Sequence, residues 1–182
     1  MKFTPGPFKG LMIIEPDVHK DERGYFYEGF QQERYAQHGI PKFVQDNVSR
    51  SKHNVVRGLH YQSPQTQGKL VGVTQGCVWD VVVDIRVSSA SFGKWVGITL
   101  SDENHLQLYI PQGFAHGYCV LSETADFYYK CTEFYNPQSE RGILWNDSEL
   151  DISWPLTGSA IISAKDKTLP AMKELQHENF FA

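Results

Sequence analysis

Cysteine is scarce in this sequence and follows no recognisable spacing. The 182 residues include three cysteines, Cys77, Cys119 and Cys131. Three irregularly placed thiols are too few for a disulfide framework or a zinc site. Each lies in a run of strand-forming residues, where a free cysteine acts as a small hydrophobic side chain. We therefore predict neither disulfides nor a cysteine-based metal site.

Long apolar runs and an excess of positive charge are also missing. No stretch approaches the roughly 20 apolar residues that a membrane-spanning helix needs, and residues 1–7 lack the apolar centre of a signal peptide. The net charge of −4 argues against general nucleic-acid binding, although it leaves room for a local basic pocket. We expect a cytoplasmic protein that binds neither membranes nor nucleic acid.

Helix signals are few, whereas strand signals recur along most of the chain. The one clear helix before the C-terminal region is expected at about residues 31–37, ahead of Gly39 and Pro41. Short β-prone runs separated by turn residues follow one another at intervals of about ten residues. Such a pattern is typical of a sandwich or barrel. We predict one all-β domain over residues 1–182, with short helices at its periphery.

Two β-prone segments carry a histidine, His60 in residues 55–62 and His116 in residues 111–117. Side chains alternate along a strand, so His60 and Gln62 share one face. Gln45 and Asn47 share a face of another strand in the same way. Inward-facing polar groups destabilise a core unless they find partners. These side chains therefore either belong to a satisfied core network or line a pocket.

The spacing of these residues resembles the two metal-binding motifs of cupin jelly-roll barrels. The first motif usually offers His-x-His and then a glutamate, and the second offers Pro-x-Gly and then a histidine. His60 and His116 keep two ligand positions, but Gln62 and Lys69 occupy the other two. A glutamine is a weak neutral ligand and an ammonium has no lone pair, yet an ammonium can stabilise an oxyanion. We expect a jelly roll without a catalytic metal. Lys69 either stabilises an oxyanion in the cavity or is simply a solvated strand lysine.

Longer stretches closely resemble the dTDP-4-dehydrorhamnose 3,5-epimerase family. The matching stretches run in order along nearly the whole chain: residues 21–26, 45–47, 56–62, 84–86, 92–95, 111–117, 140–147 and 163–166. The resemblance implies an isomerase without metal or cofactor that inverts C3 and C5 of a 4-ketohexose attached to dTDP. Both carbons adjoin the C4 carbonyl, so each inversion needs a base, an oxyanion stabiliser and an acid on the opposite face.

The resemblance assigns these roles to particular residues. It implies that His60 is the general base and that Asp166 orients it. Lys69 is expected to stabilise the C4 enolate oxygen, with His116 also lining the site. Tyr129 is expected to donate a proton from the face opposite His60, whereas its neighbour should point away as a packed strand tyrosine. Without the resemblance, a surface carboxylate and a packed tyrosine would be the ordinary interpretations of Asp166 and Tyr129.

A set of substrate-binding residues also follows from the resemblance. Cationic residues suit the diphosphate and polar or aromatic residues suit the base and the sugar. The implied set is Arg23, Phe26, Glu28, Gln45, Asn47, Arg57, Gln62, His116, Tyr135, Glu140 and Lys165. Members of the family are typically homodimers in which N-terminal strands extend the partner's sheet. Arg23, Phe26 and Glu28 are therefore expected to serve the neighbouring active site.

Three other functions remain open on the sequence alone. A mono-epimerase that inverts only C3 or only C5 would share the base, the lysine and the carboxylate. A nucleotide-sugar binding module could keep the pocket without turnover, although no catalytic residue is missing here. A metal-dependent cupin oxygenase is disfavoured by Gln62 and Lys69.

Overall fold

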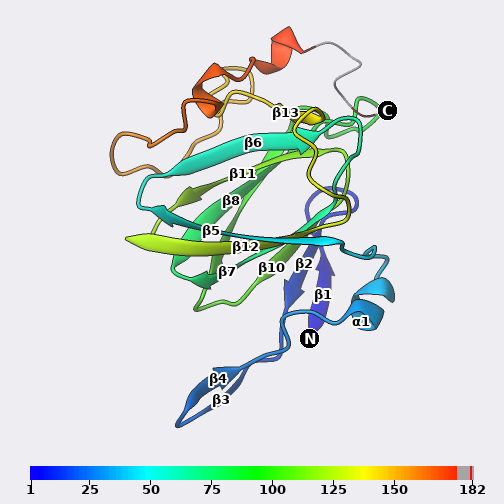
Figure 1. Ribbon diagram of the computed structural model, residues 1–182, viewed down its shortest axis with the longest axis vertical. Coiled ribbons are helices and arrows are strands. Elements are labelled where there is room, and N and C mark those ends of the chain that lie inside the picture. Colours follow the sequence, from blue (N-terminus) through cyan, green and yellow to red (C-terminus); the bar gives the residue numbers. More distant parts are fainter. Residues whose placement is uncertain (176–180, 182) are drawn as a thin grey trace.

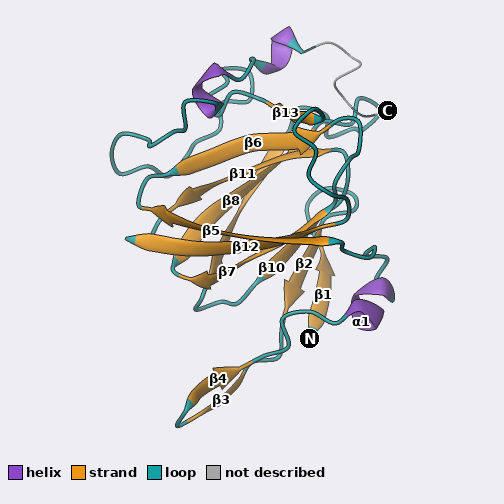
Figure 2. Cartoon of the chain, in the orientation of Figure 1, coloured by secondary structure: helices purple, strands orange, loops and turns teal. Residues whose placement is uncertain are grey.

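The computed structural model describes residues 1–175 and residue 181. Two antiparallel sheets face each other, and a small hairpin extends from them (Figure 1). Helices are short and lie at the periphery (Figure 2): α1 spans Gln32–Ala36, and the 3₁₀ turns η1 and η2 span Asp166–Thr168 and Met172–Glu174. The predicted all-β class and the predicted helix near residues 31–37 are both confirmed.

The first sheet has six strands. Their order is β1 (Lys2–Pro5), β2 (Met12–Glu15), β10 (Gln107–Ile110), β7 (Lys69–Gln75), β12 (Thr124–Cys131) and β5 (Gln45–Lys52). Strands far apart in the sequence are neighbours here, because β7 lies between β10 and β12. This arrangement places one end of β7 beside the ends of β12 and β10.

The second sheet has five strands. Their order is β13 (Glu140–Gly142), β6 (Val56–Gln62), β11 (Phe114–Val120), β8 (Cys77–Asp84) and β9 (Trp95–Ser101). The two histidine-bearing strands are therefore neighbours, and His116 pairs directly with His60. Both histidines thus come from the centre of one sheet.

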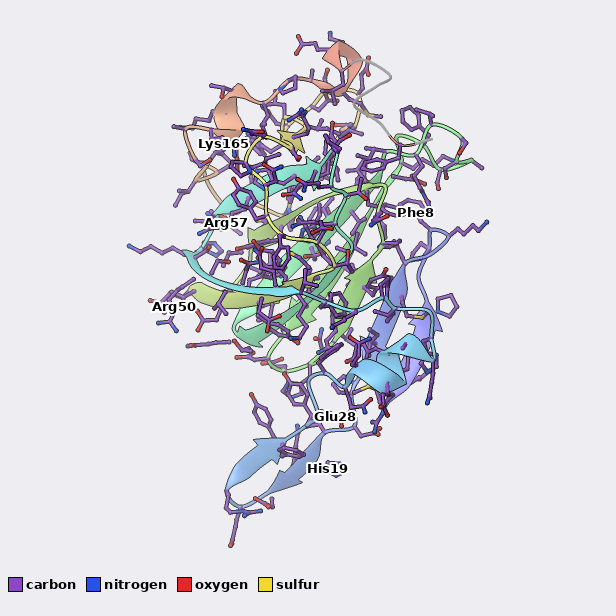
Figure 3. The ribbon with its side chains drawn as sticks, turned by 45° about the vertical axis from the view of Figure 1, so that its right-hand side comes forward. Phe8, His19, Glu28, Arg50, Arg57 and Lys165 are labelled. Carbon is purple, nitrogen blue, oxygen red and sulfur yellow. The ribbon has the colours of Figure 1, made fainter. Side chains whose placement is uncertain are left out.

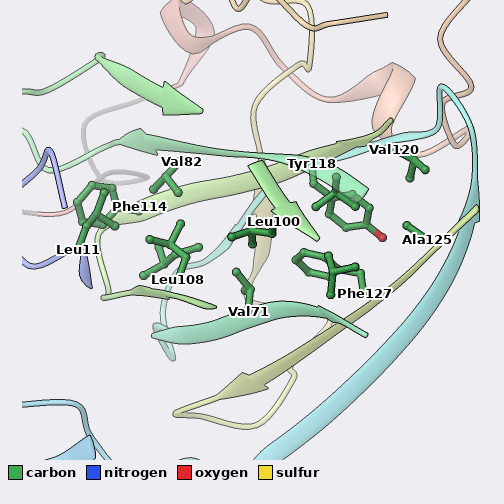
Figure 4. Close-up of a cluster of buried hydrophobic side chains, with 13 residues drawn as sticks. Leu11, Val71, Val82, Leu100, Leu108, Phe114, Tyr118, Val120, Ala125 and Phe127 are labelled. Atoms are coloured by element: carbon green, nitrogen blue, oxygen red, sulfur yellow. The ribbon is translucent and has the colours of Figure 1, made fainter. Parts of the chain in front are cut away.

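An apolar core fills the space between the sheets (Figure 4). The rings of Tyr118 and Phe127 are stacked with centroids 4.2 Å apart, which joins β11 of one sheet to β12 of the other. Val71, Val82 and Leu108 are fully buried around them. Burying each such aliphatic side chain stabilises the fold by roughly 1.5–3 kcal/mol. The core therefore holds the two sheets at a fixed separation.

The small hairpin consists of β3 (His19–Asp21) and β4 (Gly24–Phe26). It extends from the body of the molecule beside the N-terminal strands (Figure 1). The side chains of Tyr25 and Phe26 are largely exposed. The rings of Tyr25 and Tyr27 lie 4.7 and 5.0 Å from that of the buried His105, so the base of the hairpin is anchored to the body.

Candidate active site

A cavity of about 770 Å³ opens beside the two histidines. Its lining comes from β5, β6, β7, β11 and β12, and from the chain segments around residues 135–140 and 161–166. Its size falls within the range of small-molecule sites. The lining contains many polar and ionisable side chains, so this cavity is the candidate site.

His60 is paired with a buried carboxylate. Its Nε2 lies 2.8 Å from Oδ1 of Asp166, and the other carboxylate oxygen accepts a hydrogen bond from the backbone of Gly58 at 3.3 Å. Burial acts to raise the pKa of Asp166, but the hydrogen bonds from His60 and Gly58 outweigh it and leave that pKa lowered. An ionised carboxylate only accepts, so Nε2 of His60 carries a hydrogen, and in the neutral imidazole the lone pair is on Nδ1.

A bulge in β6 turns Arg57 toward the same cavity as His60. His60 pairs with His116 and Arg57 with Tyr118, so three steps along β6 match two along β11. In a regular strand, residues three positions apart would lie on opposite faces. Here both line the cavity, and Nε of Arg57 donates to Oγ of Ser51 at 3.0 Å.

Lys69 and Tyr129 lie together in another part of the cavity lining. The ammonium of Lys69 is 5.9 Å from the ring centroid of Tyr129. Among the described residues, neither the ammonium nor the phenol makes a hydrogen bond to the protein. Burial lowers the pKa of Lys69 and raises the pKa of Tyr129 to about 12. Tyr129 is therefore a protonated phenol at neutral pH.

The predicted orientation of the tyrosine pair in β12 is confirmed. Tyr128 points to the other face, where its hydroxyl accepts a hydrogen bond from Nε2 of Gln107 at 2.7 Å. A Cβ placed on Gly72 would lie within 2.7 Å of the Tyr128 ring, so that ring packs directly on the neighbouring strand. Tyr128 is a packed strand tyrosine, and Tyr129 alone of the pair lines the cavity.

One buried carboxylate of the site is absent from the sequence-based set. Asp80 of β8 is fully buried, and its Oδ2 lies 2.8 Å from Nε2 of His116. Its Oδ1 has no hydrogen-bond partner among the described residues. Burial raises the pKa of Asp80, while His116 and Lys69 act in the opposite direction. An aspartate within the otherwise apolar residues 78–83 is the one sequence signal that could have identified it.

A second group of predicted residues meets at one edge of the cavity, which we call the cavity mouth. Gln45, Asn47, Tyr135 and Glu140 line the cavity there, whereas Lys165 lies outside the lining and pairs with Glu140. The Tyr135 hydroxyl donates to Oε2 of Glu140 at 2.6 Å, and the same oxygen forms a close ion pair with Lys165. Oε1 of Gln45 accepts from the Tyr135 backbone at 2.8 Å, and Nε2 of Gln45 donates to Asn47 at 3.0 Å. These hydrogen bonds and the ion pair therefore connect β5 to the segments that precede β13 and η1.

Not all predicted residues reach the cavity of their own chain. The Arg23 side chain is 86% exposed and pairs with Asp21, and Phe26 is 70% exposed. Glu28 pairs with Arg34 at 3.1 Å. Figure 3 shows Glu28 near the base of the hairpin, away from Arg57 and Lys165. Arg23, Phe26 and Glu28 therefore do not line the cavity of their own chain, as far as the described residues show.

In residues 1–175 and 181, no group of three or more His, Cys, Asp or Glu side chains is placed to hold a metal ion. No helix in the same residues has the length and apolar character needed to cross a membrane.

Known proteins match this chain over nearly its whole length. The family model for dTDP-4-dehydrorhamnose 3,5-epimerase matches residues 5–174. The dTDP-4-dehydrorhamnose 3,5-epimerase of Escherichia coli (strain K12) is 53% identical over 168 residues, covering 91% of each chain. A more distant relative, the dTDP-4-dehydrorhamnose 3-epimerase of Streptomyces niveus, is 37% identical over 170 residues, covering 92% of this chain and 82% of the relative.

Solved structures agree with the sequence comparison. A crystal structure of dTDP-6-deoxy-D-glucose-3,5-epimerase from Legionella pneumophila, in complex with dTDP-4-keto-L-rhamnose, superposes with a TM-score of 0.96 at 51% identity. The superposition covers 99% of this chain and 97% of that one. Together with the family model, these matches show that the chain belongs to the dTDP-4-dehydrorhamnose 3,5-epimerase family.

Proposed function

We propose that this protein inverts C3 and C5 of dTDP-4-dehydro-6-deoxy-D-glucose to give dTDP-4-dehydro-L-rhamnose. The observation that carries the proposal is the set of groups around one cavity: the His60–Asp166 pair, the Lys69 ammonium and the Tyr129 phenol. These are the base, the oxyanion stabiliser and the acid that inversion next to a ketone requires.

Each inversion is a pair of proton transfers. Nδ1 of His60 takes the proton from the carbon next to the ketone, and the electron pair of that C–H bond moves to the C4 oxygen. The Lys69 ammonium stabilises the resulting enolate. Tyr129 then protonates the carbon from the opposite face, and its phenolate recovers a proton from the His60 imidazolium through solvent. The atoms and charges balance without a redox step.

The remaining cavity residues bind the rest of the substrate. Arg57 is already oriented by Ser51, and its guanidinium suits paired phosphate oxygens. Lys165 adds a second cation at the mouth, while Gln45 and Asn47 offer amide groups to the base or the sugar. The Legionella pneumophila relative was solved with dTDP-4-keto-L-rhamnose, which supports a ligand of this class.

We assign Arg23, Phe26 and Glu28 to the active site of a partner subunit. The β3–β4 hairpin extends away from β6 and β11, which carry the two histidines (Figure 1), and none of the three residues lines the cavity of its own chain. Exposed aromatic and arginine side chains are frequent anchors of protein interfaces. In a homodimer with exchanged N-terminal strands, these residues would complete the partner's cavity.

A mono-epimerase is the second candidate, because the Streptomyces niveus relative is a 3-epimerase. The two candidates differ in their products. The protein is incubated with dTDP-4-dehydro-6-deoxy-D-glucose, and the ketone is reduced with borohydride before the sugar is released and identified. Double inversion yields rhamnose and 6-deoxytalose, whereas inversion at C3 alone yields 6-deoxyallose and 6-deoxygulose. Recovery of quinovose and fucose alone would refute both candidates.

A further inference from the structure

Gln62 uses its side-chain amide to hold two loops together. Nε2 donates to the backbone carbonyl of Gln65 at 2.7 Å and to that of Phe134 at 3.2 Å. Oε1 accepts from the backbone nitrogen of Asn136 at 2.8 Å. The residue is buried. Both amide hydrogens and one carbonyl lone pair are therefore used by the backbone, although the side chain also lines the cavity.

The loop held by Gln62 carries Tyr135. The two contacts on this loop, at Phe134 and Asn136, lie on either side of that residue. The Tyr135 side chain is 52% exposed, so packing does little to fix it. Its position at the mouth depends on the backbone and on the hydroxyl contact to Glu140.

Further contacts join the same two loops. The Tyr135 backbone nitrogen itself donates to Gln45, and next to it Nδ2 of Asn136 donates to Oε1 of Gln65. Gln67 donates to the carbonyl of Glu133 at 2.8 Å, and Gly68 donates to Oγ1 of Thr132 at 2.8 Å. These contacts hold the start of the loop. Removing Gln62 would take these hydrogen bonds from the part-buried backbone groups of Phe134 and Asn136 on either side of Tyr135, and that region would shift to recover partners.

We infer that Gln62 is a positioning residue, which sets the place of Tyr135 at the cavity mouth and thereby the affinity for the sugar nucleotide. The inference rests on the proposed function. It gives Gln62 a role other than direct contact with the substrate. The position that holds a metal-ligating histidine in many cupin barrels here serves a hydrogen-bonded loop.

A double-mutant cycle tests this role. Gln62→Leu removes all three hydrogen bonds at similar side-chain volume, and Tyr135→Ala removes the side chain that Gln62 is inferred to position. The readouts are KM and kcat for deuterium uptake from D2O into dTDP-4-dehydro-6-deoxy-D-glucose. We expect Gln62→Leu to raise KM about tenfold with kcat changed less than threefold. In the Tyr135→Ala background the same substitution should change KM less than twofold.

Gln112→Leu is the matched control. Gln112 donates to the carbonyl of Thr66 at 3.1 Å, so its loss affects one of the two loops without touching the Tyr135 loop. Its KM should stay within twofold of the original value. If Gln62→Leu does not fold, as judged by circular dichroism, Gln62→Glu enters the cycle instead, because it keeps the acceptor for Asn136 and loses both donors.

Two results would overturn the inference. One is an unchanged KM for the folded Gln62 variant. The other is a rise in KM on substitution of Gln62 that is equally large in the original protein and in the Tyr135→Ala variant. Absence of exchange in the unsubstituted protein would instead refute the proposed function, so the two failures are distinguishable.

Discussion

At the scale of single residues, the reactivity of His60 depends on the charge of Asp166. Asp166→Asn removes that charge and lets Nε2 of His60 act as a hydrogen-bond acceptor. The hydrogen of the neutral imidazole can then lie on Nδ1, which is no longer free to act as the base. We expect kcat to fall by about 100-fold or more while the fold is retained. Steady-state kinetics at neutral pH measure the loss. A loss of less than threefold would show that the pair is not needed.

The same substitution has a consequence for acid stability. The pKa of Asp166 is lower in the folded protein than its ordinary value. The stabilisation is therefore complete above about pH 4, near the ordinary pKa, and is lost as the pH falls through the lowered folded pKa. Urea unfolding of the original protein should show this extra loss below about pH 4, and Asp166→Asn should not.

Asp80 is expected to govern the alkaline limit of activity. Burial lowers the pKa of Lys69, and the Asp80 carboxylate is one of the groups that oppose this effect. In Asp80→Asn this contribution is gone, so the pKa of Lys69 falls further and the ammonium is lost at lower pH. The alkaline limb of the kcat profile should shift to lower pH. An unshifted limb, with activity retained, would contradict a role for Asp80 in keeping Lys69 charged.

At the scale of elements, the bulge in β6 depends on Gly58. Its φ is +126°, and a Cβ at this position would lie 2.5 Å from Cα of Gly117 on β11. Gly58→Ala should lower the free energy of unfolding by about 2–4 kcal/mol, from backbone strain together with overpacking. It should also weaken the contact from Gly58 to Asp166 and thus reduce kcat.

Gly39→Ala is the matched control for the bulge. Gly39 also has a positive φ, of +77°, but a Cβ there would meet nothing within 4 Å. We expect a loss of about 1 kcal/mol from the left-handed conformation alone and an unchanged kcat. Urea unfolding and steady-state kinetics measure both variants. Equal losses of stability in the two variants would contradict the close approach between β6 and β11.

The strands that line the cavity also show which site residues the sequence pattern could place and which it could not. Alternation correctly put His60 and Gln62 on one face of their strand, and Gln45 and Asn47 on one face of theirs, because these pairs lie within regular pairing. It left open whether the side chains line a pocket, and the structure places all four in the lining of one cavity. Alternation could not bring Arg57 to the same cavity, because an extra residue in β6 depends on a partner strand more than 50 residues away. Asp80 was missed because a single acidic residue in an apolar strand has no periodicity of its own.

At the scale of the whole molecule, a partner subunit is predicted to complete the site. If Arg23 serves the neighbouring cavity, each active site takes His60 from one subunit and Arg23 from the other. In a mixed dimer of Arg23→Ala and His60→Ala, one site then has both residues intact and the other site lacks both. Mixing the two variants under conditions of subunit exchange should therefore regenerate about a quarter of normal activity, because some mixed dimers contain one intact site. Light scattering checks that the mixture is dimeric.

No recovery in a mixture that contains mixed dimers would place Arg23 at the site of its own chain. The sequence could indicate this arrangement only through the family resemblance. Nothing in the pattern of residues 19–28 shows which cavity they approach, because that depends on the assembly. The single chain shows only that they lie outside their own cavity.

The central claim is that His60, Lys69 and Tyr129 invert two carbons next to one ketone. The most direct test is proton NMR of dTDP-4-dehydro-6-deoxy-D-glucose incubated with the protein in D2O. We expect deuterium at both C3 and C5, no deuterium in the presence of His60→Ala, and more exchange than net inversion with Tyr129→Phe. Deuterium at one carbon only would contradict double inversion, and undiminished exchange with His60→Ala would contradict the assignment of the base.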